Sequence, residues 1–545
     1  MKAKPKFFKL AGAIFLLLFI FLPRALFGAE ALVRETKSGK VEGTIFQSEL
    51  WGETITAYAW LGVPYAKAPV GELRWKAPRP PEPWQEIKSC KKFPPPCTQY
   101  AGLMATMDCE KFGEVVGSED CLYLNIWRPP TDEKNLPVFF WIHGGANCVG
   151  QSAMSLYYGA NFAYRENMIF VSINYRLGPF GWFFHPALSS GDALDNSGNY
   201  GTLDIIQALR WVKENIAYFG GDPNNITIAG ESAGGVNVYS LLVSPLSKGL
   251  FQRAISQSGA PLTGSKKKAE KKAEDVLFQL LVKDGLVKSK QEAEKFLASK
   301  SKTWIATYLR SKSAKEILSC YKKGSFGNIS EFPNVFVDGV VIPDSPYKLL
   351  RKGKYNKVPF LVGCNKQELK LFLPLSLSTL SEAEFCQLIK SLNPDQPQIK
   401  IRDYVSPLIY YNPFFWPAYS LLGRAGGIGF ELAGVDIPAN YMSKHQKDVY
   451  VYRFCWNDEP KPFDFLIGSG HAMEIPFVFA NFQQDENSVL RFAWSKENEK
   501  GRVALSKKMM SFWANFARTG NPNGKGLEQW KPWSRTKPNR MIFGK

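Results

Sequence analysis

The chain has 545 residues, of which 45% are hydrophobic and 14% aromatic, and its formal net charge is +19. This much apolar material can build a large core and excludes an intrinsically disordered chain. The positive charge is compatible with attraction to anionic surfaces or substrates. No aromatic-laced basic groove or known motif accompanies it, so we expect no nucleic-acid partner.

The N-terminus has the pattern of a secretory signal peptide. Four early lysines precede an apolar run from Leu10 to Leu22, and the small residues Ala29 and Ala31 follow. The run is shorter than the roughly 20 residues that span a bilayer. Residues 1–31 are therefore predicted to be a cleaved signal peptide, with an uncleaved anchor as the alternative. Cleavage would give a secreted or periplasmic protein without stable membrane insertion.

Short segments typical of antiparallel strands come next, at 31–46 and 55–66. Continuous apolar runs alternating with helical patterns follow, among them "PVFFWIHGG", "MIFVSINYR", "NITIAGES" and "VPFLVGCN". This order predicts an α/β fold with a large, mostly parallel central sheet flanked by helices. Residues 32–545 are predicted to be a single domain. The lysine-rich stretch 265–296 and a segment around 395–440 are expected to be insertions that carry helices.

Nine cysteines follow the predicted signal peptide, so at least one should be unpaired. Export would permit disulfides. Four cysteines lie close together and allow three pairings, which the spacing leaves open: Cys90, Cys97, Cys109 and Cys121.

A serine lies between two glycines in the pattern Gly230-x-Ser232-x-Gly234, after a predicted strand and before a helix-like stretch. This context is typical of a nucleophile elbow, a sharp turn that exposes a serine hydroxyl. The pattern alone is a weak signal and also fits a Gly-rich turn. The interpretation therefore depends on a base and an acid elsewhere in the chain.

The order of residues along the chain restricts the candidate base. In α/β-hydrolases the serine precedes the acid, and the acid precedes the histidine. Of four histidines, this order leaves His445, in a polar helical stretch, and His471, in a Gly-rich loop. Loops after strands commonly carry catalytic residues, so His471 is the expected base, with an ordinary loop histidine as the alternative.

Glu368, just past an apolar strand, is the best candidate for the acid. Asp338 precedes a glycine in a pair typical of a hairpin turn, and Asp344 follows a proline in ordinary turn chemistry. Both aspartates therefore have simpler explanations. Glu368 itself has the alternative of a surface carboxylate that opens a helix.

Small residues at Gly144, Gly145 and Ala146 follow a predicted strand upstream of the serine. They are similar to an oxyanion motif whose backbone N–H groups act with that of the residue after the nucleophile, here Ala233. An ordinary loop of small residues is the alternative. No cysteine and histidine cluster has zinc-site spacing, and no metal or organic cofactor is expected.

Several long segments match one family in order: "SEDCLYLNIW", "FGGDPNNITIAGESAGG", "FQRAISQSGAP", "GHAMEIPFVFAN" and "MMSFWANFARTGNPN". Over nearly all of the mature chain, the sequence resembles the type B carboxylesterase family, which includes the cholinesterases. The resemblance implies an α/β-hydrolase fold with N-terminal antiparallel strands. The site residues that it implies are a Ser232, Glu368 and His471 triad, oxyanion donors at Gly145, Ala146 and Ala233, a Cys97–Cys121 disulfide, Ser258 beside the acid, and Glu231 in the pocket.

The chain departs from the family pattern at several positions. Leu369 follows the acid where the family usually has glycine, and Asn147 stands where a bulky apolar residue is usual, with Cys148 after it. The lysine-rich region has no cysteines for the family's second disulfide. No tryptophan lies between Cys97 and Cys121, which disfavours choline esters as substrates.

These residues together predict a secreted serine carboxylesterase that hydrolyses small-molecule esters through an acyl-enzyme. A non-catalytic binding or adhesion protein on the same fold is one alternative. A lipase is another, and it would need a large apolar lid or patch that a sequence cannot show. Asn225 and Asn328 begin sequons and are potential glycosylation sites.

Overall fold

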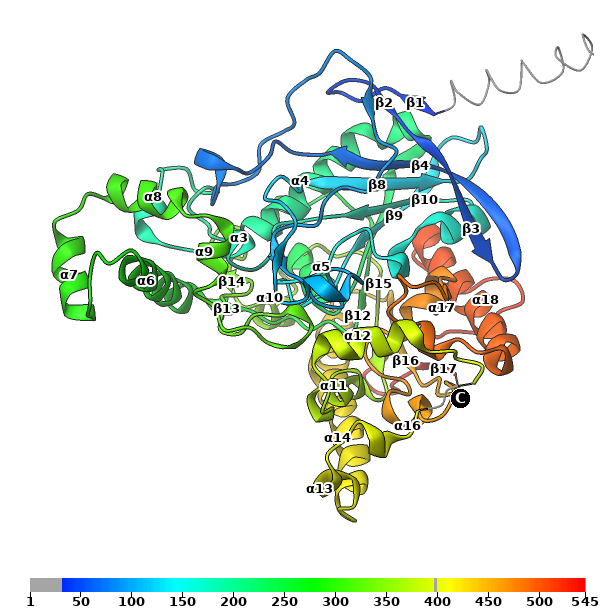
Figure 1. Cartoon of the computed structure of the whole chain (residues 1–545). Helices are drawn as coiled ribbons and strands as arrows, with labels where there is room; N and C mark the ends of the chain where they lie inside the picture. The colour runs from blue at the N-terminus through cyan, green and yellow to red at the C-terminus, as the bar shows by residue number, and fades with distance from the viewer. Residues whose placement is uncertain (1–31, 397–398, 545) are drawn as a thin grey trace, which may run out of the picture.

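A ten-stranded sheet forms the centre of the protein in a computed structural model that describes residues 32–396 and 399–544 (Figure 1). The predicted signal peptide, residues 1–31, lies outside the described residues. The strand order is β17-β16-β15-β12-β11-β9-β10-β8-β4-β3. All neighbours from β17 to β10 run parallel, whereas β8, β4 and β3 add antiparallel pairings at one end.

The central strands have the following bounds: β3 (Thr44–Leu50), β4 (Glu53–Pro64), β8 (Tyr123–Arg128), β9 (Leu136–Ile142), β10 (Ile169–Ile173), β11 (Gly221–Glu231), β12 (Arg253–Gln257), β15 (Phe360–Asn365), β16 (Val449–Phe454) and β17 (Met541–Phe543). Short strands form small sheets beside them: β1 (Val33–Arg34) with β2 (Val41–Glu42) and β5 (Lys88–Ser89), β6 (Gln99–Tyr100) with β7 (Val115–Val116), and β13 (Gly264–Ser265) with β14 (Phe336–Val337).

Successive residues of a strand point to opposite faces of the sheet, so each face needs its own apolar cover. Helices pack on both faces and form two cores. Phe140 of β9 belongs to the core that contains the apolar residues of α4 (Tyr200–Asn215) and α5 (Ala233–Val243). Its neighbour Trp141 belongs to a second core with α2 (Ala160–Glu166), α17 (Ile475–Phe479) and α18 (Lys496–Thr519). The predicted α/β class, with a mostly parallel sheet flanked by helices, is confirmed.

Two groups of helices extend from this body (Figure 1). The lysine-rich stretch lies in an arm formed by α6 (Lys266–Lys283), α7 (Lys290–Ala298), α8 (Lys302–Ser311) and α9 (Ala314–Leu318). The second predicted insertion forms α13 (Pro407–Tyr410) and α14 (Phe415–Phe430), which project beyond α11 (Leu373–Leu377) and α12 (Glu382–Ser391). Both segments carry helices, as expected. In the described ranges, no helix is long and apolar enough to cross a bilayer.

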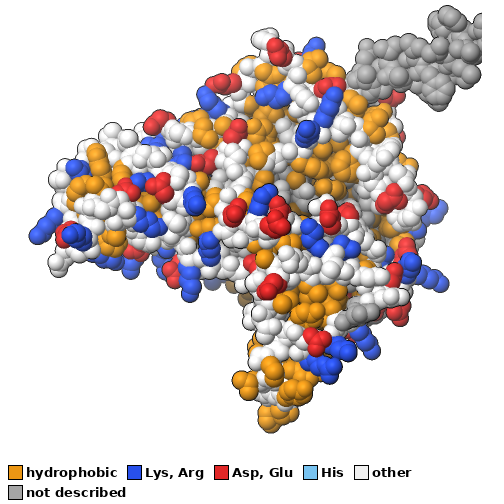
Figure 2. Space-filling view, in the orientation of Figure 1, with side chains coloured by type: hydrophobic (Ala, Val, Ile, Leu, Met, Phe, Trp, Pro, Cys, Tyr) orange, Lys and Arg blue, Asp and Glu red, His pale blue; other side chains and the backbone are white. Residues whose placement is uncertain are grey.

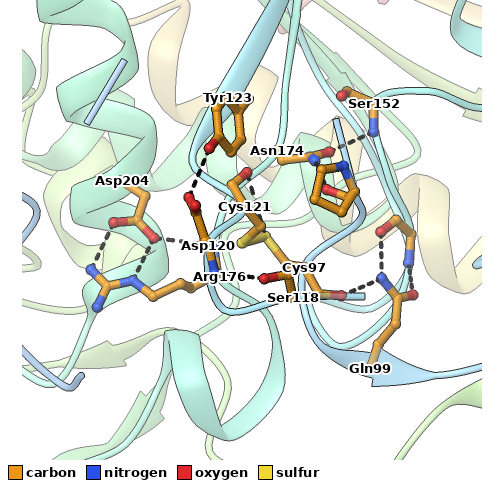
Figure 3. The surroundings of a disulfide bond; sticks show 12 residues. Cys97, Gln99, Ser118, Asp120, Cys121, Tyr123, Ser152, Asn174, Arg176 and Asp204 are labelled. Carbon is orange, nitrogen blue, oxygen red and sulfur yellow. Dashed lines mark hydrogen bonds and ion pairs between the residues drawn. A yellow bond between two sulfur atoms is a disulfide. The ribbon is translucent and has the colours of Figure 1, made fainter. Parts of the chain in front are cut away.

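Two disulfides connect the loops at one edge of the sheet. Cys97 and Cys121 are joined, which confirms the pairing that the resemblance implied (Figure 3). Beside this disulfide, Gln99 exchanges two hydrogen bonds with the backbone of Gly150, at 2.7 and 2.9 Å. Cys109 and Cys386 form the second disulfide across 277 residues. It ties the loop closed by the first disulfide to α12.

A buried ion pair lies near the Cys97–Cys121 disulfide (Figure 3). Arg176 donates from Nε and Nη2 to the carboxylate oxygens of Asp204 in α4, at 2.8 and 2.7 Å. The two side chains are 3% and 0% exposed. Because water reaches neither group, each charge depends on the other for compensation.

We expect Asp204→Asn to destabilise the protein by about 3–5 kcal/mol, because it leaves the Arg176 charge buried without its partner. Glu214→Gln is the matched control, since Glu214 pairs with Lys37 at 3.3 Å on the surface and its loss should cost less than about 1 kcal/mol. Urea unfolding of the two variants measures the difference. Equal losses would contradict the assigned role of burial.

Candidate active site

Ser232 lies at the turn where β11 ends and α5 begins. Its φ is 57° and its ψ is −121°, a conformation that non-glycine residues rarely adopt. Such strain costs on the order of 1–3 kcal/mol and persists only where the surroundings impose it. The Ser232 N–H donates to the carbonyl of Gln257 in β12 at 2.9 Å, which holds the turn in place. This is the strand–turn–helix context predicted for a nucleophile elbow.

The glycines on either side of Ser232 are required by close packing. A Cβ at Gly234 would lie 2.0 Å from the carbonyl oxygen of Ile142 at the end of β9. A Cβ at Gly230 would lie 2.5 Å from the carbonyl carbon of Gly234. Both distances are far below van der Waals contact. Only glycine fits at these two positions, so their spacing around the serine follows from the turn itself.

His471 and Glu368 lie in contact, although 103 residues separate them. The distance between His471 Nδ1 and Glu368 Oε2 is 2.5 Å. Glu368 is fully buried and begins the short helix η8 (Glu368–Leu371) after β15. Its Oε1 accepts hydrogen bonds from Ser258 Oγ and from the Asn365 N–H, both at 2.7 Å. The structure therefore brings together the predicted base, the predicted acid and the residue expected beside the acid.

The other ring nitrogen of His471 contacts a second carboxylate. Nε2 lies 3.0 Å from Glu231 Oε1, and Glu231 directly precedes Ser232. Ser232 and His471 line the same cavity. Within residues 32–396 and 399–544, however, no hydrogen bond joins His471 to Ser232 Oγ. The described conformation thus places Glu231 where the expected nucleophile–base contact would form.

Buried carboxyl groups set the electrostatics around His471. Burial alone would lower the pKa of His471, but Glu231 and Glu368 outweigh it and raise this pKa well above its ordinary value. Burial likewise raises the pKa of Glu231. Glu474 accepts a hydrogen bond from Asn365 Nδ2 at 2.6 Å, and burial raises its pKa to about 8. Glu474 is therefore mostly neutral at pH 7, so it contributes hydrogen bonds rather than a third negative charge.

The predicted oxyanion loop follows β9. Gly145 and Ala146 have positive φ values of 102° and 53°, and both border the cavity. In the described part of the chain, the N–H groups of Gly145, Ala146 and Ala233 donate no hydrogen bond to another residue. Backbone donors that are free beside a nucleophile are what oxyanion stabilisation requires.

Asn147 explains how this loop is held without the usual bulky apolar residue. Its Oδ1 accepts hydrogen bonds from Asn237 Nδ2 at 2.8 Å and from the Tyr175 hydroxyl at 3.2 Å. Its Nδ2 donates to Asn334 Oδ1 at 2.7 Å. Asn147 is completely buried. Directional hydrogen bonds therefore replace apolar packing as the support of the loop.

The two sequon asparagines are half-buried and engaged in contacts. Asn328 Oδ1 accepts a hydrogen bond from the Cys148 thiol at 2.5 Å and lies on the cavity wall. Asn225 Oδ1 accepts a hydrogen bond from Arg253. A glycan would be attached to Nδ2, and Asn225 Nδ2 donates to the carbonyl of Arg518 at 3.5 Å.

An apolar cavity of about 250 Å³ extends from Ser232. The loop between Cys97 and Cys121 contributes Leu103 and Met104 to its wall. Most of the remaining wall comes from apolar side chains of the helices beside it, among them Leu371, Phe385, Leu388, Trp416 and Phe463. The Cys109–Cys386 disulfide joins that loop to α12, so it fixes two walls of the cavity relative to each other.

The other candidates from the sequence lie outside this cavity wall. The ring of His445 contacts the carbonyl of Arg351 at 3.1 Å. Asp344 pairs with Lys348 at the start of α10 (Pro346–Arg351). Asp338 accepts hydrogen bonds from backbone N–H groups that follow it, including that of Ile342 at 2.8 Å. The expected hairpin at Asp338 is wrong, because the next element after β14 is the helix α10 and the described residues 338–345 contain no second strand.

Sequence reasoning missed Glu474 and the second disulfide. Glu474 lies three residues after His471 in the quoted "GHAMEIPF" segment, and this proximity was a usable signal. Cys109 and Cys386 lie 277 residues apart, and nothing in their local sequence indicates the pairing.

The fold and this geometry define an α/β-hydrolase. A sequence model of the carboxylesterase family matches residues 30–404 and 429–544, and the chain belongs to that family. It is 36% identical to mouse carboxylesterase 1E over 536 residues, covering 91% of this chain and 87% of the mouse protein. It is 33% identical to the para-nitrobenzyl esterase of Bacillus subtilis (strain 168) over 507 residues, covering 90% of each chain.

Solved structures agree with this assignment. A PNB esterase superposes with a TM-score of 0.68 at 30% identity, over 94% of this chain and 96% of that chain. A Geobacillus stearothermophilus carboxylesterase gives a TM-score of 0.65 at 33% identity, with the same coverage. The protein is therefore a carboxylic ester hydrolase.

Leu369, which stands where the family usually has glycine, fits because α14 provides space for it. A Cβ at Gly426 of α14 would lie 2.2 Å from Leu369 Cγ. The next residue of α14 is also close to the loop, since a Cβ at Gly427 would lie 2.1 Å from the Lys366 carbonyl oxygen.

We expect Gly426→Ala to destabilise the wild-type protein by about 1–3 kcal/mol through overpacking against Leu369. In a Leu369→Gly background, which also removes the Leu369 Cβ that would lie 3.1 Å away, the same change should stabilise by up to about 1 kcal/mol, because alanine is the better helix former. Urea unfolding of the four proteins measures both effects. The same sign in both backgrounds would show that Leu369 does not determine the residue at 426.

Proposed function

We propose that the protein is an exported serine carboxylesterase with Ser232 as nucleophile, His471 as base and Glu368 as the acid that orients it. The observation that carries this proposal is the His471–Glu368 contact at 2.5 Å, in a cavity that also contains Ser232 at a strained turn. A nucleophile, an oriented base and free backbone donors are the parts that acyl transfer needs.

In the proposed reaction, His471 Nε2 removes the proton of Ser232 Oγ as that oxygen attacks the ester carbonyl carbon. The N–H groups of Gly145, Ala146 and Ala233 hold the resulting oxyanion. When the tetrahedral intermediate collapses, His471 protonates the departing alcohol, and an acyl-enzyme remains on Ser232. Water then attacks the acyl-enzyme by the same steps, which releases the acid and restores the serine.

Before the attack, His471 has to exchange its contact with Glu231 for one with Ser232. Catalytic hydrogen bonds are often long or misaligned in unliganded sites and tighten when substrate binds. Glu231 directly precedes Ser232, and Ser232 and His471 line the same cavity, so in the proposed reaction the ring changes partners within that cavity. We assign Glu231 the role of stabilising the protonated imidazole, together with Glu368.

The cavity supports esters with an apolar acyl or alcohol group as substrates. Its wall is predominantly apolar, and the loop between Cys97 and Cys121 contributes Leu103 and Met104. That loop contains no tryptophan, the side chain that best attracts a quaternary ammonium group. The tryptophan that the cholinesterases carry in this loop is therefore absent, which disfavours choline esters, and the cavity's Trp416 belongs to α14 instead.

Export is supported by two observations. The N-terminal sequence has the order of a signal peptide, with a basic start, an apolar run and small residues. Two disulfides, Cys97–Cys121 and Cys109–Cys386, are typical of proteins that fold in an oxidising compartment.

We expect Ser232→Ala to lower kcat for a chromogenic short-chain ester by about 10⁴-fold or more, because the variant cannot form the acyl-enzyme. Labelling by an organophosphonate should be lost as well. Ser325→Ala is the matched control, because Ser325 borders the same cavity and lies outside the proposed triad. Full activity in Ser232→Ala would refute the proposal, and an inactive wild type without an initial burst would favour a non-catalytic binding protein.

We expect Glu231→Gln to shift the acidic limb of the kcat/KM profile to lower pH. Only neutral His471 accepts the serine proton, so activity falls as pH drops through its pKa, which Glu231 helps to raise. Removing that negative charge lowers this pKa, so the neutral form persists to lower pH. Initial rates across the pH range measure the limb. Glu382→Gln, at a carboxylate bound to the Phe326 N–H, is the control that should not move it.

A further inference from the structure

The helices α13 and α14 expose large apolar side chains. Leu408, Tyr411 and Phe414, at the tip, are 86%, 74% and 81% exposed. We call α13 and α14 together the projection. Four further apolar side chains, in α14 and just after it, are more than half exposed: Leu421, Leu422, Ile428 and Leu432. Figure 2 shows hydrophobic side chains gathered at the lower end of the molecule. Contiguous apolar surface of this kind marks an interaction site.

Several large apolar side chains of α14 face solvent and not the core. Phe414, Leu421 and Ile428 are seven residues apart, so they share one face, and that face points outward. The buried positions of the helix are Tyr419, Gly423 and Gly427, so its inward face carries one large side chain. A helix that only covered the core would bury its large apolar residues instead. The segment 405–428 also falls between the two ranges that match the carboxylesterase family.

The inner side of the projection forms part of the wall of the catalytic cavity. Tyr404, Val405 and Trp416 line that cavity. The Trp416 ring also contacts the ring of Phe465, with centroids 5.8 Å apart. Apolar surface therefore continues from the exposed tip, through the base of the projection, to the cavity that contains Ser232.

Basic groups accompany the apolar tip. Between residues 399 and 432, the exposed charged side chains are Lys400, Arg402, Arg424 and a single acid, Asp403, which lies 3.6 Å from Arg402. The lysine-rich arm exposes further basic residues, among them Lys267, Lys268, Lys271 and Lys288, together with the exposed acids Glu274, Glu292 and Glu294. In Figure 2, Lys and Arg side chains follow the lower edge of this arm, and the projection extends toward the same side. Positive charge around an apolar tip is complementary to an anionic lipid surface.

We propose that the α13–α14 projection inserts into the surface of an anionic phospholipid bilayer and passes ester substrates from the lipid to the cavity. The first part concerns binding alone, and the second rests on the proposed esterase function. Leu408 and Phe414 stand almost clear of the protein on a convex tip, which a fluid lipid layer can surround. Tyr411 at the tip, and Tyr410 and Trp416 behind it with ring centroids 6.3 Å apart, are residue types that favour the membrane–water boundary.

Vesicle flotation tests the binding. We expect the wild type to float with vesicles that contain phosphatidylglycerol and much less with vesicles of phosphatidylcholine alone. The double variant Leu408→Ser and Phe414→Ser should bind at least about tenfold more weakly, because two apolar side chains no longer leave water. Ile45→Ser with Ile87→Ser is the matched control, since these side chains are 54% and 53% exposed elsewhere on the surface.

Each outcome of the flotation experiment is decisive. Failure of the wild type to bind either vesicle, or equal binding by both double variants, overturns the proposal. Sedimentation of the protein without vesicles measures whether it forms a dimer. A wild-type dimer that dissociates in the Leu408→Ser and Phe414→Ser variant, without vesicle binding, would make the projection a contact between two copies of this chain and would also overturn the proposal.

Kinetics separate this proposal from the esterase function. The projection variant should hydrolyse a soluble short-chain ester at the wild-type rate, because Leu408 and Phe414 lie outside the cavity wall. Its hydrolysis of a long-chain ester carried in phosphatidylglycerol vesicles should fall about tenfold, in parallel with binding. Loss of activity on both substrates would point to misfolding and is checked by urea unfolding. A wild type that floats and hydrolyses neither ester would refute the esterase function while the binding stands.

Discussion

The contact between α5 and β9 is the constraint on which the site depends. Gly234 brings the first turn of α5 against the carbonyl of Ile142, with no room for a side chain. That approach forces Ser232 into its rare backbone conformation and leaves the Ala233 N–H beside it. Because β9 also leads into Gly145, one packing contact determines where the proposed nucleophile and the proposed oxyanion donors lie relative to each other. The sheet supplies the rigidity that keeps this strain in place.

The electrostatics of the site follow from burial rather than from charge alone. His471 lies between Glu231 and Glu368, and the pair favours the imidazolium that the proposed acyl transfer would form. A third nearby carboxyl group, Glu474, is held mostly neutral by burial, so the site does not accumulate negative charge. Asn365 connects these groups, because its N–H binds Glu368 and its side chain binds Glu474.

The fold and the proposed triad were accessible from the sequence because they depend on local patterns. Apolar runs identified the buried strands, and the glycines on either side of Ser232 indicated a tight turn that only glycine permits. His471 and Glu368 followed from chain order. The Cys109–Cys386 pairing and the Glu231 contact with His471 were not predictable, because each depends on how distant loops fold together. The apolar face of α14 was missed because a periodic pattern does not show which side meets solvent.

The Cys109–Cys386 bond has a consequence for how the enzyme is produced. The proposed catalytic groups are supported by the sheet, whereas the cavity wall formed by α12 is joined to the loop between Cys97 and Cys121 by this disulfide. In a host compartment that keeps thiols reduced, this disulfide would not form. The residues held by the sheet would keep their positions, whereas α12 would no longer be fixed to the loop on the opposite wall of the cavity. Selectivity among esters, more than turnover itself, would then vary with the expression system.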